Sequence, residues 1–175
     1  MLNPDGVILG NSRCGASGKD LNREFRSRSR FMFPEVTQLK NLVDKIGETH
    51  DIELYLDFHG HSRKKNMFMF GPDYNITQPD YYKCRVFPKL LSNITNVFRY
   101  YSCSYTISND KKTTARAVML SEMMIPLVFT VEASLGFYHD YSEHKDKPFS
   151  RKKWEEMGEN VVSALKEYFE GIEQY

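Results

Sequence analysis

Two residues with catalytic potential follow apolar stretches that are predicted to form strands. His59 lies in the segment LDFHGHS, and Glu132 lies in the segment FTVEAS. A neutral histidine ring nitrogen binds metal ions, and a carboxylate can act as a general base toward a bound water molecule. In an open α/β sheet, ligands gather beyond the carboxyl ends of the strands, so we expect both side chains close together at one such edge. The alternative is that each is a half-buried polar residue with a local hydrogen bond.

A third group of candidates lies near the start of the chain, where Arg13 precedes the pair Asn22 and Arg23. A guanidinium can hold a carboxylate through two parallel hydrogen bonds, and a neighbouring amide adds another donor. We expect these residues to line the same concavity as His59. Three further arginines follow closely, at Arg26, Arg28 and Arg30. By charge alone, a solvated basic surface is therefore the better interpretation of this segment.

The expected elements alternate between helix and strand. Helices are predicted by apolar residues at helical spacing, and strands by alternating or continuous apolar runs. In chain order we expect a helix at 34–47, a strand at 52–59, a strand at 66–70, a helix within 79–98 that Pro88 starts or kinks, a helix at 113–124, a strand at 126–131 and a final helix that Ser150 caps. This order predicts the α/β class, with a mixed β-sheet and helices on both faces. The glycine-rich opening is expected to be a loop.

The composition restricts the class of protein. A chain of 175 residues with 41% hydrophobic residues is long enough for one domain with a core. The net charge of +1 argues against binding nucleic acid through overall charge, and no apolar run has the length of a membrane helix. No secretory signal is visible, and the three cysteines lack the spacing of a disulfide framework or a zinc knot. We therefore expect a cytoplasmic protein that binds neither nucleic acid nor membrane.

Four segments, in this order, resemble the zinc metallocarboxypeptidases, and within them the cytosolic carboxypeptidase branch that trims glutamates from protein tails. They are NPDGVILGNSRCGASGKDLNREF, LDFHGHS, TARAVM and FTVEAS. Each segment alone is weak evidence, whereas four of them in the family order are specific. The resemblance runs from Asn3 to about Phe137. It implies a carboxypeptidase-like fold in which residues 1–175 form the C-terminal part of a catalytic domain.

The resemblance also implies a role for each candidate residue. His59 resembles the last of three zinc ligands. Glu132 resembles the carboxylate that deprotonates the zinc-bound water and passes the proton to the leaving amine. Arg13 resembles the arginine that stabilises the tetrahedral oxyanion, a task suited to a fixed positive charge. Asn22 and Arg23 resemble the pair that holds the terminal carboxylate of the substrate.

The implied substrates are acidic. Arg116, in TARAVM, is placed by the resemblance in the pocket for the substrate side chain, where a cation favours a terminal Glu or Asp. A helix arginine is otherwise a solvated charge. The expected partners are acidic protein tails such as those of tubulin, with the cytoskeleton or a cilium as a further expected location. The family also has a tyrosine between the third zinc ligand and the catalytic glutamate. Three tyrosines of this sequence are candidates for it, Tyr100, Tyr101 and Tyr105, and none is assigned.

The resemblance leaves the zinc site incomplete, because the family's other two ligands form a His-x-x-Glu pair upstream of the matching segment. The pair His50 and Glu53 has this spacing, but Glu53 and His59 would lie about 20 Å apart on one strand, too far to share an ion with bonds of about 2 Å. His61 is expected to be a neighbouring loop residue. We therefore expect zinc ligands upstream of Met1, and little zinc binding by the chain alone.

Two accounts follow from the missing ligands. The chain is either the C-terminal part of a longer zinc carboxypeptidase or a short paralogue that has lost catalysis. An inactive paralogue would be a binding or structural module for acidic C-termini or microtubules. The survival of the candidate site residues favours the first account. Nucleic-acid binding through the arginines at 26, 28 and 30 is the weakest alternative, because no aromatic residues are interleaved with them in a way that would stack bases.

Overall fold

The computed structural model describes residues 1–172, which divide into two compact units. The first unit comprises Met1–Tyr55 and Ile107–Val128. The second comprises residues 56–106 and 129–172. In the described part of the chain, no helix is both long and apolar enough to cross a membrane.

The first unit is built from helices. They are α1 (Pro4–Leu9), η1 (Leu21–Arg23), α2 (Pro34–Gly47), η3 (Asn109–Lys111) and α4 (Ala115–Ser121). The range predicted for α2 is confirmed, because Pro34 occupies the first turn, where a missing N–H leaves no hydrogen bond unmade. Its inner face buries Val36 and Val43, seven residues apart, against Val118 and Met119 of α4.

The opening of the chain contains a helix that the sequence analysis did not predict. Helix α1 begins after Asn3, whose side-chain oxygen accepts a hydrogen bond from the backbone N–H of Gly6 at 3.0 Å. It ends at Gly10, which has a left-handed φ of 76° that glycine adopts without strain. The expectation of a loop was wrong because caps, rather than an apolar stripe, define this short helix.

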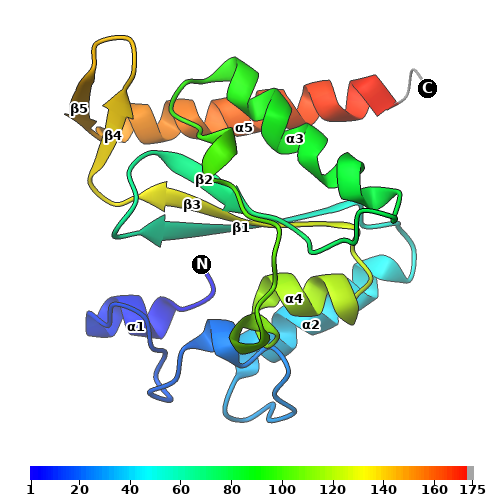
Figure 1. Cartoon of the computed structure of the whole chain (residues 1–175). Coiled ribbons are helices and arrows are strands. Elements are labelled where there is room, and N and C mark those ends of the chain that lie inside the picture. The colour runs from blue at the N-terminus through cyan, green and yellow to red at the C-terminus, as the bar shows by residue number, and fades with distance from the viewer. Residues whose placement is uncertain (173–175) are drawn as a thin grey trace. The chain divides into compact units, whose positions relative to one another are not determined.

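A three-stranded sheet, most of which belongs to the second unit, has the strand order β1 (Leu54–His61), β3 (Leu127–Ser134) and β2 (Met67–Phe70). Strands β2 and β3 are antiparallel. Strands β1 and β3 run in the same direction (Figure 1). The sheet is therefore mixed, and the predicted α/β class is confirmed. Strand β1 continues two residues beyond the end predicted at His59.

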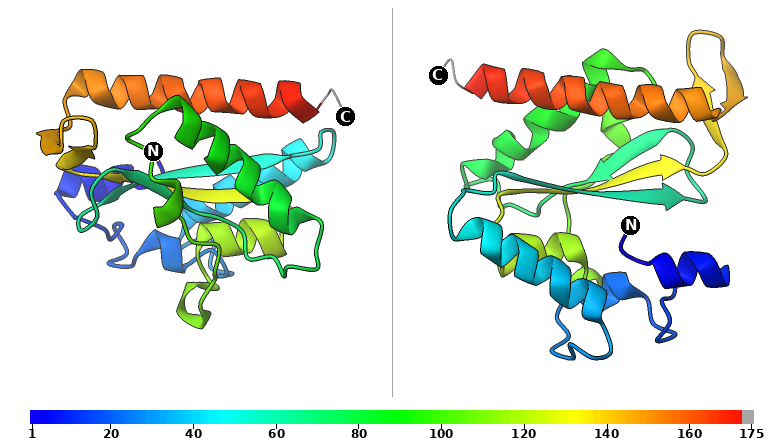
Figure 2. Two further views of the ribbon diagram at one scale, coloured as in Figure 1. Left: turned by 45° about the horizontal axis from the view of Figure 1, so that its top comes forward. Right: turned by 180° about the vertical axis from the view of Figure 1, so that it is seen from behind.

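Two helices of the second unit, α3 (Asp80–Ile94) and α5 (Arg151–Ile172), pack against each other. Both lie along one side of the strands in the two views of Figure 2. The ring of Phe87 on α3 lies 5.7 Å from that of Phe129 on β3 and 6.4 Å from that of Tyr168 on α5, so one side chain joins the three elements. Pro88 lies inside α3 rather than at its start. The predicted cap of α5 is confirmed, since the Ser150 hydroxyl accepts from the Lys153 N–H at 3.2 Å.

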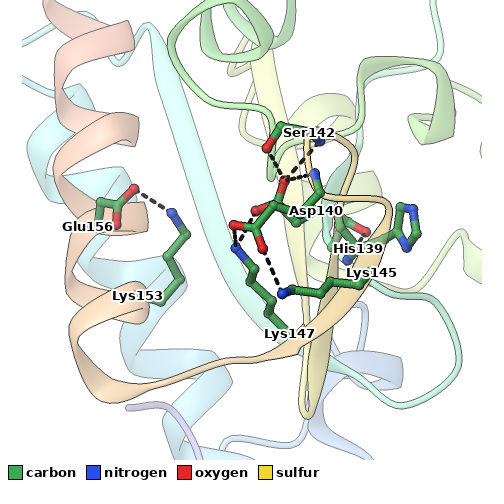
Figure 3. A network of polar contacts seen from close by, with 9 residues as sticks. His139, Asp140, Ser142, Lys145, Lys147, Lys153 and Glu156 are labelled. Atoms are coloured by element: carbon green, nitrogen blue, oxygen red, sulfur yellow. Dashed lines mark hydrogen bonds and ion pairs between the residues drawn. The ribbon is translucent and has the colours of Figure 1, made fainter.

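A small hairpin in the second unit was not predicted. Its strands are β4 (Phe137–Asp140) and β5 (Lys145–Pro148), and a 3₁₀ turn, η2 (Tyr100–Ser102), lies elsewhere in the same unit. The hairpin sequence is mostly polar and charged, so it lacks the apolar alternation that identifies a strand. Ion pairs and turn hydrogen bonds define it instead (Figure 3).

Candidate functional site

His59 and Glu132 both lie near the carboxyl ends of adjacent strands of the second unit. Each stands two residues before the last residue of its strand, His61 in β1 and Ser134 in β3. The N–H of Leu135, just beyond β3, donates to the carbonyl of His61 at 3.1 Å, so the two strand ends are joined directly. The register of the parallel strands therefore places His59 and Glu132 at the same edge of the sheet.

The ring of His59 is oriented by a carboxylate that the sequence analysis missed. Nε2 of His59 lies 2.8 Å from Oδ2 of Asp57, and both side chains are largely buried. The two residues share a strand face because side chains two positions apart point to the same side. A carboxylate partner fixes the orientation of a histidine ring and raises its basicity as a ligand.

His61 is a strand residue rather than the loop residue expected from the sequence. Its Nδ1 accepts hydrogen bonds from the backbone N–H groups of Arg63 at 3.1 Å and Lys64 at 2.9 Å. Its ring meets that of Phe68 edge to face, with the centroids 5.1 Å apart. Through these contacts, His61 stabilises the end of β1 and the turn toward β2. Its Nδ1 is therefore not available as a metal ligand in this arrangement.

Asp20 organises the candidate residues of the first unit. Its Oδ2 accepts from Nη1 of Arg13 at 2.9 Å, and its Oδ1 accepts from the backbone N–H of Asn22 at 2.9 Å. Nη1 of Arg23 lies 3.8 Å from the same carboxylate. Asp20 caps the 3₁₀ turn η1, a position where aspartate is favoured. That capping preference is the sequence signal that would have found it.

The side chain of Asn22 joins this loop to helix α4. Its Oδ1 accepts from the backbone N–H of Ala115 at 2.8 Å, and its backbone carbonyl accepts from Nη1 of Arg23 at 2.9 Å. The Oδ1 of Asn22 is thereby fixed, and the amide Nδ2 keeps the donor capacity that a carboxylate ligand needs. Arg116 follows Ala115 directly, so the same hydrogen bond brings η1 next to the first turn of α4.

Burial separates the candidate arginines from the basic stretch that follows them. Arg116 is 6% exposed, so it is not the solvated helix charge of the alternative interpretation. The side chain of Arg23 is 32% exposed, against 45% for Arg26, which pairs with Glu122. Arg13 is 65% exposed and forms an ion pair with Asp20. A buried guanidinium must be compensated by hydrogen bonds or opposite charge. The position of Arg116 is therefore specified by the packing of the first unit.

The residues present do not form a complete zinc site. Within residues 1–172, no three His, Cys, Asp or Glu side chains are grouped closely enough to hold a metal ion. A catalytic zinc needs three protein ligands and an open position. The His59–Asp57 pair provides one oriented ligand, so the described residues do not fit a resident zinc ion by themselves.

The three candidate tyrosines differ in environment. Tyr101 is 92% exposed. Burial raises the pKa of the Tyr100 hydroxyl and raises that of Tyr105 more strongly. The guanidinium of Arg85 lies 4.2 Å from the centre of the Tyr105 ring, and a Cβ at Gly71 would touch that ring. Tyr105 is thus packed in the interior of the second unit, and the family tyrosine stays unassigned.

The chain is similar over nearly its whole length to part of much longer proteins. It is 38% identical over 172 residues to cytosolic carboxypeptidase 3 of Mus musculus, in an alignment that covers 96% of this chain and 17% of the relative. It is 38% identical over 178 residues to cytosolic carboxypeptidase 1 of Homo sapiens, which covers 94% of this chain and 14% of the relative. The chain therefore spans less than a fifth of the length of these relatives. No protein-family model matches it.

Solved structures share the fold. A metallo-carboxypeptidase from Burkholderia cenocepacia superposes with a TM-score of 0.78 at 19% identity, over 98% of this chain and 43% of that one. A metallo-carboxypeptidase from Pseudomonas aeruginosa, in complex with (2-guanidinoethylmercapto)succinic acid, superposes with a TM-score of 0.75 at 25% identity, over 94% of this chain and 43% of that one. The fold of the chain is therefore that of a part of these enzymes.

Proposed function

Because the chain is a homologue of one segment of the cytosolic carboxypeptidases, as its four sequence segments predicted, we propose that it carries part of the active site of a carboxypeptidase-like hydrolase. Its substrates are acidic protein tails, such as those of tubulin, from which it removes C-terminal or side-chain-linked glutamates. The observation that carries the proposal is the 38% identity to cytosolic carboxypeptidase 3 over 96% of the chain. Such a substrate would place the protein at the cytoskeleton or a cilium.

Substrate recognition is assigned to Asn22 and Arg23. Nη1 of Arg23 is positioned by the Asn22 carbonyl at 2.9 Å and by Asp20 at 3.8 Å, and its other N–H groups can form a planar fork for a carboxylate. The Asn22 amide supplies the additional donor. We assign the substrate side chain to Arg116, because a buried guanidinium favours a terminal Glu or Asp.

The chemical roles are assigned to Arg13 and Glu132. Arg13 donates one N–H to Asp20, and its remaining donors can stabilise the oxyanion that forms when the scissile carbonyl is attacked. Glu132 acts as a general base toward the attacking water and returns the proton to the leaving amine. His59, oriented by Asp57, supplies one ligand of the family's zinc ion, and one ligand is too few for a catalytic site.

A second candidate function is recognition without catalysis. The described residues lack a group of three metal ligands, whereas Asp20, Asn22 and Arg23 form a connected arrangement. A module with these features would bind acidic C-termini or microtubule tails and leave them intact. Like the hydrolase, this module would hold the terminal carboxylate with Asn22 and Arg23, which together with the Asp20 and Arg13 side chains that surround them form the carboxylate clamp. It would differ from the hydrolase only in zinc and turnover.

The two functions are separated by zinc content and glutamate release. We expect the 175-residue chain alone to bind zinc weakly and to release no glutamate from a glutamate-ended peptide. Joining it to an upstream His-x-x-Glu segment from a cytosolic carboxypeptidase should restore both stoichiometric zinc and release, because three ligands are then available. Restored zinc without any glutamate release would favour the binding module. Stoichiometric zinc in the chain alone would show that ligands have been missed, with His50, Glu53 and His61 the first to re-examine.

A further inference from the structure

A basic pocket lies beside the sheet of the second unit, where β2 begins. It has a volume of about 480 Å³, within the range of ordinary ligand sites. Seven residues line it: Lys64, Lys65, Asn66, Arg99, Ser102, His139 and Tyr141. Three of them are permanently cationic and none is acidic. The N–H of Ser134, at the end of β3, donates to the Asn66 carbonyl at 3.0 Å, so the pocket adjoins the strand that carries Glu132.

Asn66 holds the hairpin against the start of β2. It is 2% exposed and has a φ of 68°, a left-handed conformation that is rare outside glycine. Its Nδ2 donates to the carbonyl of His139 at 3.1 Å, and its Oδ1 accepts from the N–H of the same residue at 3.0 Å. Both amide atoms are therefore used to fix β4.

Hydrogen bonds of Asp140 also hold the turn that follows β4, and this turn carries Tyr141. Oδ1 of Asp140 accepts from the N–H of Ser142 at 2.9 Å and from its hydroxyl at 2.6 Å, and Oδ2 accepts from Nζ of Lys147 at 2.7 Å (Figure 3). The guanidinium of Arg99 lies 3.7 Å from the centre of the Tyr141 ring. The N–H of Arg99 donates to the Met67 carbonyl at 2.7 Å. The guanidinium is thereby ordered before a ligand arrives, which lowers the entropic cost of binding.

The positive charges of the pocket are only partly balanced. Asp146 forms an ion pair with Lys65, and its Oδ1 lies within hydrogen-bond distance of Nδ1 of His139, at 2.9 Å. Nζ of Lys64 lies 4.6 Å from the centre of the Phe68 ring. A single carboxylate thus faces two of the basic side chains, while Lys64 and Arg99 face aromatic rings, which attract a cation but do not neutralise it.

We propose that this pocket binds the carboxylate side chains of an acidic peptide. The proposal rests on the proposed function for the identity of the peptide, but the pocket lies in the second unit and uses none of the clamp residues. An extended acidic chain suits an open pocket with separate cations, because each cation can meet a different carboxylate.

Two other anions fit the pocket less well. A phosphate site at a helix N-terminus would place lining residues in the first turn of an α-helix, and none of the seven lies in an α-helix. A single-stranded nucleic acid would need an aromatic face on which to stack a base. The lining aromatic, Tyr141, is stacked by Arg99.

The test is fluorescence anisotropy with labelled N-acetyl-pentaglutamate amide, whose blocked C-terminus removes the carboxylate that the clamp would hold. We expect the 175-residue chain to bind this probe, and Lys64→Gln with Arg99→Gln to weaken binding about tenfold, as the loss of two charge-assisted contacts implies. Asp146→Asn should tighten binding about threefold, because it frees Lys65 from its counter-charge. Arg23→Gln should leave binding of this probe unchanged.

Controls keep the result interpretable. Lys152→Gln makes the same change of charge on the exposed surface of α5 and should have little effect. Lys64→Gln alone changes an exposed side chain and still tests the pocket if the double variant fails to fold, with about a threefold loss expected. Unchanged binding in the Lys64 and Arg99 variants would overturn the proposal. It would also be overturned if pyrophosphate or oligothymidylate displaced the probe at lower concentration than unlabelled pentaglutamate amide. If Arg23→Gln alone abolished binding of the amide, the pocket would likewise be excluded.

Discussion

The carboxylate clamp of the first unit and the sheet edge of the second unit are held in place by different forces. At the clamp, Asp20 accepts hydrogen bonds from Arg13 and from the Asn22 backbone, and Asn22 reaches Ala115. At the sheet edge, the ladder of β1, β3 and β2 fixes His59 and Glu132 through the backbone. A site on strands depends on pleat and register, whereas a site on a loop depends on side chains that bind the backbone.

This difference determines how each site should respond to substitution. At the sheet edge, a changed side chain should remove chemistry while the backbone geometry stays as it is. At the clamp, a change at Asp20 should disturb several groups, because Arg13 and Asn22 bind it directly and Arg23 lies close to it.

The largest effect should come from two substitutions at the sheet edge, made in the chain joined to an upstream His-x-x-Glu segment. Glu132→Gln should lower glutamate release at least about 100-fold, because the general base is lost. Zinc measured by atomic absorption should stay bound in this variant, whereas His59→Ala should lose zinc as well as turnover. Loss of zinc in Glu132→Gln would mean that Glu132 is a ligand or a structural residue, and its assignment as base would be wrong.

A smaller effect is expected at Asp57, in the same joined protein. Asp57→Asn should weaken zinc affinity about tenfold or more, the usual cost of removing a carboxylate that orients a ligating histidine. The affinity can be measured by competition with a chelator. Asp51→Asn, a change at an exposed carboxylate just before β1, is the matched control. Equal affinity in the Asp57 and Asp51 variants would show that Asp57 does not position His59.

At the clamp, Asp20→Asn should weaken binding of a glutamate-ended peptide by about fivefold, although Asp20 itself does not hold the substrate. The reason is that Arg13 loses its ion-pair partner and η1 loses the charge that caps it. Titration calorimetry on the 175-residue chain measures this effect. Asp44→Asn, on the exposed face of α2, should bind as the unchanged chain does. If the Asp20 and Asp44 variants bound equally, the organising role of Asp20 would be excluded.

The smallest effect concerns the hairpin. Hydrogen bonds from Lys147 and then Ser142 hold the pKa of Asp140 below its usual range. Protonation is therefore harder in the folded hairpin than in the unfolded chain, whose aspartate pKa is about 3.9. The contribution to stability is present above that value and is lost as the pH falls through the folded pKa. Protection of the β4 and β5 amides, measured as the exchange rate relative to the intrinsic rate at each pH, should fall below about pH 4 more in the original sequence than in Asp140→Asn, and an equal fall in both would contradict the assignment.

The parts of the fold that follow from apolar pattern could be predicted from the sequence. Helix α2 and strand β2 have an apolar stripe and an apolar run, and both lie where expected. Helix α1 and the hairpin of β4 and β5 were missed because caps, turns and ion pairs define them. These interactions join residues whose pairing depends on the folded chain.

The candidate site was predictable to the same extent. His59 and Glu132 follow from strand position, and the clamp residues follow only from resemblance to a family. Asp57 and Asp20, which orient the candidate residues, were not found. Each has a local signal: Asp57 lies on the same strand face as His59, and Asp20 lies in a helix-capping position. The burial of Arg116 has no sequence signal, because it depends on packing within the folded protein.

The role proposed for Asn22 and Arg23 can be tested with two peptides that differ only at the C-terminus. Titration calorimetry of the 175-residue chain with a glutamate-ended peptide and with its C-terminal amide isolates the free carboxylate that Asn22 and Arg23 are proposed to hold. We predict about tenfold tighter binding of the free acid, as a bidentate charge-assisted contact implies. This preference should be lost in Arg23→Gln and kept in Arg30→Gln, an exposed arginine of the same loop. Equal affinity for acid and amide in the unchanged chain would contradict the account.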